Sequence, residues 1–107
     1  MKTFKLVGLQ IEDTAVTENS VIPLKDGLVI NKEDGENSWL IEALISKEWL
    51  PLFNEHMEQP DTQLKVLVTI SKTTNTPAQI SASVKNITEL DESISVLLDG
   101  RLLARSV

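Results

Sequence analysis

The sequence predicts a mainly β protein, a single small antiparallel β-barrel of about seven strands with one α-helix inserted near residues 47–59. Apolar and polar residues alternate through most of the chain, which is typical of strands that bury one face. One segment changes instead to the 3.6-residue period of a helix. A chain of 107 residues has the size of one domain, 1–107, and closing its strands into a barrel removes edges that would otherwise be exposed. A β-sandwich with a helical insertion is the alternative architecture.

The N-terminal part is predicted to hold a strand, a loop and a tight turn. The first strand has an apolar row at Val7, Leu9 and Ile11. Residues 13–20 are polar and show no clear period, which predicts a loop. Residues 25–27, Lys-Asp-Gly, predict a tight turn, because glycine supplies the positive φ that such turns need.

A hairpin over residues 28–45 is the strongest local prediction. Two apolar runs, 28–30 and 39–45, are joined by a short connection at 33–37 that contains an Asp-Gly pair. Such a connection between apolar runs favours a hairpin.

The helix is predicted directly after this hairpin. Its apolar residues are Trp49, Leu50, Leu52, Phe53 and Met57. These residues share one face at helical spacing, with His56 beside them. Pro51 is tolerated only near the helix start, where its missing N–H would be unpaired anyway, and the helix ends before Pro60. The helix is therefore expected to begin close to Lys47.

Three further strands are predicted after the helix. Their inward rows are Leu64, Val66, Val68 and Ile70, then Ala78, Ile80, Ala82 and Val84, then Ile94, Val96 and Leu98. The step from Val84 to Ile87 breaks the alternation, which predicts a bulge or the end of the strand. The polar residues 89–92 predict a bend, and the small inward residues Ala78 and Ala82 suit a tightly curved sheet.

The composition excludes several classes of function. The chain has no cysteine and one histidine, so disulfide scaffolds, cysteine-ligated metal sites and sites that need two imidazoles are excluded. The formal net charge of −6 argues against a nucleic-acid partner, which would favour a basic protein face. The N-terminus lacks the apolar core of a signal peptide, and no apolar stretch is long enough for a transmembrane helix. We therefore expect a cytoplasmic protein with no membrane partner.

Three side chains are candidates for contact with a ligand or a partner: Trp39, Trp49 and His56. Histidine is the side-chain type that titrates near neutral pH, but no Gly-x-Ser-x-Gly motif accompanies His56, so a structural role on the helix is favoured. The two tryptophans flank the junction of hairpin and helix. They form either a ligand shelf or partner anchor or, as base rates of burial favour, a packing contact where helix meets sheet. The acidic turn at 33–36 lacks the ligand spacing of a calcium loop, and we expect no catalytic residue, cofactor or metal.

Four segments together resemble one known family. They are residues 1–7 (MKTFKLV), 22–33 (IPLKDGLVINKE), 39–44 (WLIEAL) and 93–98 (SISVLL). The sequence resembles the YwpF-like family of Bacillus and Staphylococcus relatives over most of its length. That resemblance implies a β-barrel core similar to the tube proteins of type VI secretion systems. Family members also carry a C-terminal helix pair, for which we expect no counterpart in a sequence that ends at Val107, and no catalytic motif belongs to the family.

Two hypotheses about function follow from these observations. The leading one is a non-enzymatic cytoplasmic interaction module, which binds another protein or its own copies, and a similarity to tube proteins favours assembly into a ring or dimer. The alternative is a small-ligand-binding barrel with a pocket at its mouth near Trp39, Trp49 and His56. An enzyme that uses His56 with an acidic neighbour is the least favoured reading, since no catalytic constellation accompanies that histidine.

Overall fold

The structure is a computed structural model that describes residues 2–12, 20–33, 35–58 and 63–103. Its elements, in chain order, are β1 (Lys2–Glu12), β2 (Ser20–Val21), β3 (Leu24–Asn31), β4 (Ser38–Ser46), the 3₁₀ turn η1 (Lys47–Trp49), α1 (Leu50–Glu58), β5 (Leu64–Ile70), β6 (Ala78–Glu89) and β7 (Ser93–Leu102). The chain is thus mainly β with one helical segment, as predicted.

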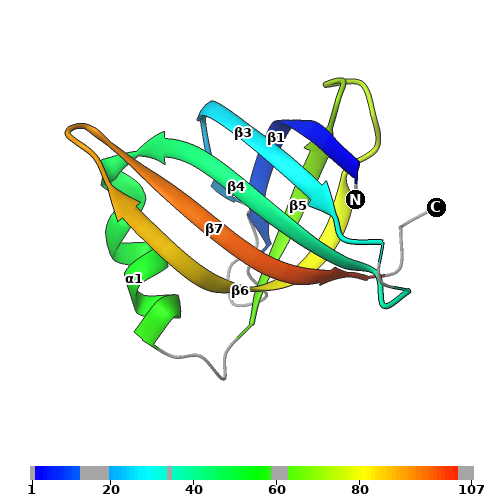
Figure 1. The fold of residues 1–107 in the computed structure, drawn as a ribbon. Helices are drawn as coiled ribbons and strands as arrows, with labels where there is room; N and C mark the ends of the chain where they lie inside the picture. Colours follow the sequence, from blue (N-terminus) through cyan, green and yellow to red (C-terminus); the bar gives the residue numbers. More distant parts are fainter. Residues whose placement is uncertain (1, 13–19, 34, 59–62, 104–107) are drawn as a thin grey trace.

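Six of the strands close into an antiparallel barrel (Figure 1). Neighbours follow the order β1-β3-β4-β7-β6-β5, and β5 pairs again with β1, from Leu6↔Ile70 to Glu12↔Lys65. The two-residue β2 extends the ladder on the β3 side of β1. The pairing of β1 with β5 confirms the barrel and rules out the sandwich alternative, which would leave those strands in separate sheets.

The predicted hairpin is confirmed as β3 and β4, which pair from Leu24↔Ile45 to Asn31↔Trp39. Its connection turns through residues with positive φ, at 53° for Glu33, 79° for Gly35 and 58° for Asn37. Glycine and asparagine favour this backbone region, which explains why the Asp-Gly pair was a good turn signal.

The predicted tight turn at residues 25–27 is wrong, because these residues lie inside β3. The register of β3 against β4 is irregular between Leu24 and Asp26, and this interrupts the alternation that identifies a strand. Gly27 does not have a positive φ. A glycine is favoured at this position because a Cβ atom would lie only 3.0 Å from a methyl carbon of Leu6. The loop predicted at 13–20 lies, except for Ser20, outside the described residues.

The inward row predicted for the first strand is partly wrong. Leu9 and Ile11 are buried as expected, but Leu6 is buried instead of Val7. The register of β1 against β5 shifts between Leu6 and Gly8, and an extra residue at such a shift reverses which side chains face inward. In contrast, the bulge predicted in β6 is confirmed between Val84 and Asn86.

Side chains fill the interior of the barrel. The buried apolar residues are Leu6, Leu9, Ile11, Ile22, Val29, Ile41, Ala43, Ile45, Phe53, Leu64, Val66, Val68, Ala78, Ile80, Ala82, Ile94, Val96 and Leu98. They come from all six strands, from the segment after β2 and from α1, so the barrel has a packed core and not a continuous channel.

The helix closes one end of the barrel (Figure 1). It begins at Lys47 and ends at Glu58, as predicted, counting η1 as its first turn. The Lys47 amide donates to the Glu92 carbonyl at 3.2 Å, which ties the helix start to the bend between β6 and β7. α1 packs against β6, and Phe53 is its one buried residue.

No helix among the described residues is long and apolar enough to cross a membrane.

Candidate functional site

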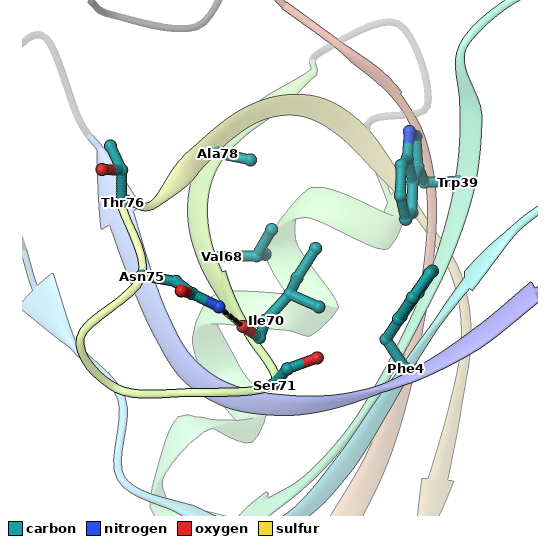
Figure 2. A pocket seen from close by; sticks show the side chains of 8 residues that line it. All are labelled: Phe4, Trp39, Val68, Ile70, Ser71, Asn75, Thr76 and Ala78. Carbon is teal, nitrogen blue, oxygen red and sulfur yellow. Dashed lines mark hydrogen bonds between the residues drawn. The ribbon is translucent and has the colours of Figure 1, made fainter.

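The end of the barrel opposite the helix carries a hollow of about 390 Å³ (Figure 2). We call it the mouth hollow. It is lined by Phe4, Trp39, Val68, Ile70, Ser71, Asn75, Thr76 and Ala78. Figure 2 shows α1 behind these residues, at the far end of the barrel, which agrees with its position in Figure 1. The volume lies in the range of small-molecule sites, about 300–1,000 Å³.

The apolar lining residues are the last members of inward rows. Side chains alternate along a strand, so Trp39 faces the same way as Ile41 and Ala43. These two buried residues follow it along β4, deeper in the barrel. The same argument places Phe4 above Leu6 and Ile70 above Val68. The interior is filled below this layer, and the hollow is what remains where the strands end.

Two aromatic rings form one wall of the hollow. The ring centroids of Phe4 and Trp39 are 6.3 Å apart and the rings are tilted by 38°. This separation lies within the range of favourable aromatic pairs, and both rings are half-buried, so each keeps part of its surface open. In Figure 2 they lie next to each other, across the hollow from Asn75 and Thr76.

The loop between β5 and β6 supplies the polar rim. Its first residue, Ser71, has a φ of 68° and donates its amide to the Lys5 carbonyl at 2.9 Å, which holds the loop against β1. The side-chain amide nitrogen of Asn75 donates to the Ile70 carbonyl at 2.6 Å (Figure 2). With its nitrogen used inside the loop, the side-chain oxygen of Asn75 is available as an acceptor at the rim.

The structure does not bring the three predicted contact residues together. Trp39 lines the mouth hollow, whereas Trp49 lies in η1 and His56 in α1. Strand β4 carries the chain from one end of the barrel to the other between the two tryptophans, a distance of about 20 Å at 3.3 Å per residue. Trp49 is half-buried against the core, which agrees with a packing role.

Sequence reasoning missed Phe4 and the rim residues. Phe4 and Leu6 are two positions apart and point to the same side of β1. The register shift after Leu6 separates them from the inward row of Leu9 and Ile11, so the sequence pattern does not show that Phe4 faces inward. The rim residues lie in the polar loop 71–77, which nothing in the sequence connects to Trp39.

A smaller hollow of about 250 Å³ lies on the outside of the barrel, and we call it the outer hollow. It is lined by Asp26, Gly27, Leu28, Glu42, Leu44, Leu90 and Ser95. It belongs to a wider outward-facing surface on β3, β4 and β7, which we call the outer face and define by Leu28, Ile30, Leu40, Leu44 and Leu97. All five of these aliphatic side chains are half-buried and alternate with core residues.

Comparison with known proteins agrees with this fold. A family model described as YwpF-like protein matches residues 2–106. The chain is 55% identical over 107 residues to a Bacillus subtilis (strain 168) protein described as "Uncharacterized protein YwpF", covering 98% of this chain and 78% of that protein. It also superimposes on the crystal structure of a hypothetical protein from Staphylococcus aureus, with a TM-score of 0.89 and 32% identity, covering 97% of this chain and 71% of the other. The resemblance seen in the sequence segments is confirmed.

Proposed function

The chain belongs to the YwpF-like protein family, and we propose that it acts as a non-enzymatic cytoplasmic interaction module that binds a protein partner or its own copies. The outer face is the observation that carries this proposal. Its aliphatic side chains lie on three neighbouring strands, with Ile30 opposite Leu40, and they surround the exposed Glu42, which lies opposite Leu97. Aliphatic side chains gathered on one face and rimmed by polar residues favour an interaction site.

The charges beside the outer face indicate what kind of partner fits. Asp26 and Glu42 are exposed and both line the outer hollow, next to Leu28 and Leu44. A protein surface that presents an apolar side chain beside a lysine or arginine would match this arrangement. Two copies of a chain with a net charge of −6 repel each other, so a basic partner is favoured over a second copy, and a ring of copies like that of tube proteins stays the less favoured form.

The absence of an enzymatic role is part of the proposal. Within the described residues, no hydrogen bond or ion pair joins His56 to a serine or a carboxylate. A histidine without an orienting acid or a nucleophile in reach supplies little catalysis, and this favours a binding function.

We expect Leu44→Lys to weaken partner binding, because it places a charge among the aliphatic side chains of the outer face, where Leu44 lines the outer hollow. The tagged protein is used to capture partners from the native cytoplasm, and capture by the variant should fall by about 30-fold, the effect of losing roughly 2 kcal/mol at an interface hot spot.

Sedimentation velocity of the purified protein tests self-assembly with the same variant. If the wild-type protein forms an oligomer through the outer face, Leu44→Lys should sediment as a monomer.

The matched control is Met57→Lys, which places the same charge on an exposed apolar residue of α1, far from the outer face. It should capture the wild-type set of partners in wild-type amounts. Equal capture by both variants, together with an unchanged sedimentation coefficient, would overturn the outer face as the interaction site.

Binding of a small ligand is a second candidate function, and the mouth hollow favours it. The pocket has walls of two kinds, aromatic and aliphatic, and a polar rim, as ligand sites commonly do. It differs from the pocket expected from the sequence, since of the three residues proposed there only Trp39 takes part.

A further inference from the structure

We propose that the mouth hollow binds a small uncharged molecule with a planar ring system, which stacks on Trp39 and Phe4 and donates a hydrogen bond to the rim. This inference rests on the second candidate function above and does not depend on the outer face.

The charge of the ligand follows from the lining. None of the eight described residues that line the hollow has an ionisable side chain. A charged ligand would lose hydration on entering and would find no opposite charge to compensate, which is costly. An uncharged ligand avoids that penalty.

The shape of the ligand follows from the walls. The rings of Phe4 and Trp39 form the aromatic side of the hollow, half-buried Ile70 offers aliphatic carbons beside them, and the buried residues Val68 and Ala78 lie beneath (Figure 2). A flat ring system contacts both surfaces at once, and an aromatic contact adds to the free energy gained from burial.

The hydrogen bond is inferred from the one that the Asn75 side chain already makes. One N–H of its side-chain amide donates to the Ile70 carbonyl, which fixes the orientation of the amide and leaves its oxygen as an acceptor for a ligand. A ligand with one N–H or O–H group at the edge of its ring system would therefore be oriented with that edge toward the loop 71–77. The hydroxyl groups of Ser71 and Thr76 lie on the same rim.

The test uses two probes that share a ring system and differ in charge. N-phenyl-1-naphthylamine is uncharged and has one N–H group, whereas 8-anilino-1-naphthalenesulfonate carries a sulfonate in addition. Each is titrated into the Trp49→Phe protein, in which Trp39 is the remaining tryptophan and reports on the hollow. We expect saturable quenching of Trp39 by the neutral probe and at least about tenfold weaker binding of the sulfonate, the equivalent of 1.4 kcal/mol.

Three variants in the same background locate the site. Ala78→Leu fills part of the hollow and should weaken the neutral probe by at least about tenfold. Asn75→Ala removes the rim acceptor and should weaken it by about two- to tenfold, as expected for one hydrogen bond. Leu90→Gln, on the outer hollow, should leave the affinity unchanged. The urea midpoint of each variant shows whether it is folded.

Several results would overturn the proposal. An absence of saturable quenching by the neutral probe removes the site, and equal affinity for the two probes removes the uncharged class. Binding that persists unweakened in a folded Ala78→Leu protein places the probe elsewhere. Partner capture through the outer face is measured with Leu44→Lys, so either proposal can fail while the other stands.

Discussion

Replacing Gly100 by alanine should destabilise the protein by about 3 kcal/mol. A Cβ atom at this position would lie 2.6 Å from the Ser81 carbonyl oxygen, 2.7 Å from a methyl carbon of Ile80 and 2.8 Å from the Cβ of Ala82. Real Cβ atoms do not approach other atoms so closely, and the nearest of these atoms belongs to backbone that is held in the β6–β7 ladder. Overpacking a well-packed site typically costs about 1–3 kcal/mol, and the upper end applies here because the strands themselves must separate.

Urea unfolding followed by tryptophan fluorescence measures this effect. A domain of this size has about 5–15 kcal/mol of stability, so the midpoint should fall by a large fraction while the slope stays the same. Gly35→Ala is the control, because no atom lies within 4 Å of its added Cβ and the penalty comes only from a φ of 79°, about 1–2 kcal/mol. If Gly100→Ala were no more destabilising than Gly35→Ala, the strands at Gly100 would be able to adjust, and the close approach would not be a constraint on the barrel.

The regular part of this fold could be predicted because a single physical rule generates it. In β5, β6 and β7 the buried residues fall at every second position, so the sequence pattern and the inward rows coincide. The rule fails where a strand contains an extra residue. The irregularity before Asp26 made a piece of β3 look like a turn, and the shift between Leu6 and Gly8 reversed the inward row of β1. Neither irregularity breaks the alternation as visibly as the step from Val84 to Ile87, which predicts the bulge in β6.

The site was harder to predict than the fold because a barrel has two ends. Trp39 and Trp49 are ten positions apart in the sequence, and the hypothesis of a shared pocket places both at one mouth of the barrel. Trp39 is the second residue of the nine-residue strand β4, which carries the chain across the whole barrel before Trp49, so the length of this strand is itself evidence against a shared pocket. Phe4, in contrast, comes from a distant part of the chain and meets Trp39 through the neighbouring ladders, in which Lys2 pairs with Asn31 and Asn31 with Trp39. The pairing of β1 with β5 then brings the loop that holds Asn75 beside them.

Replacing Phe53 by alanine should destabilise the protein by about 4 kcal/mol, the largest effect we expect from a single truncation. Phe53 is 0% exposed and is the one buried residue among the nine residues of α1. Truncating a buried phenylalanine removes its burial free energy and leaves a cavity, which together cost about 3–5 kcal/mol. The cavity here would lie between the helix and the barrel end, where α1 packs on β6.

Equilibrium unfolding of Phe53→Ala and Met57→Ala separates the role of this side chain from that of the helix as a whole. Met57 lies one helical turn further along α1 and is 40% exposed, so its truncation should cost about 0.5 kcal/mol or less. Phe53→Leu should fall between the two, because leucine fills part of the space. Nearly equal effects of Phe53→Ala and Met57→Ala would contradict this account, since α1 would then contribute little to closing the barrel end. A large difference would show that one side chain seals the end opposite the mouth hollow, which leaves the hollow as the open end of the barrel.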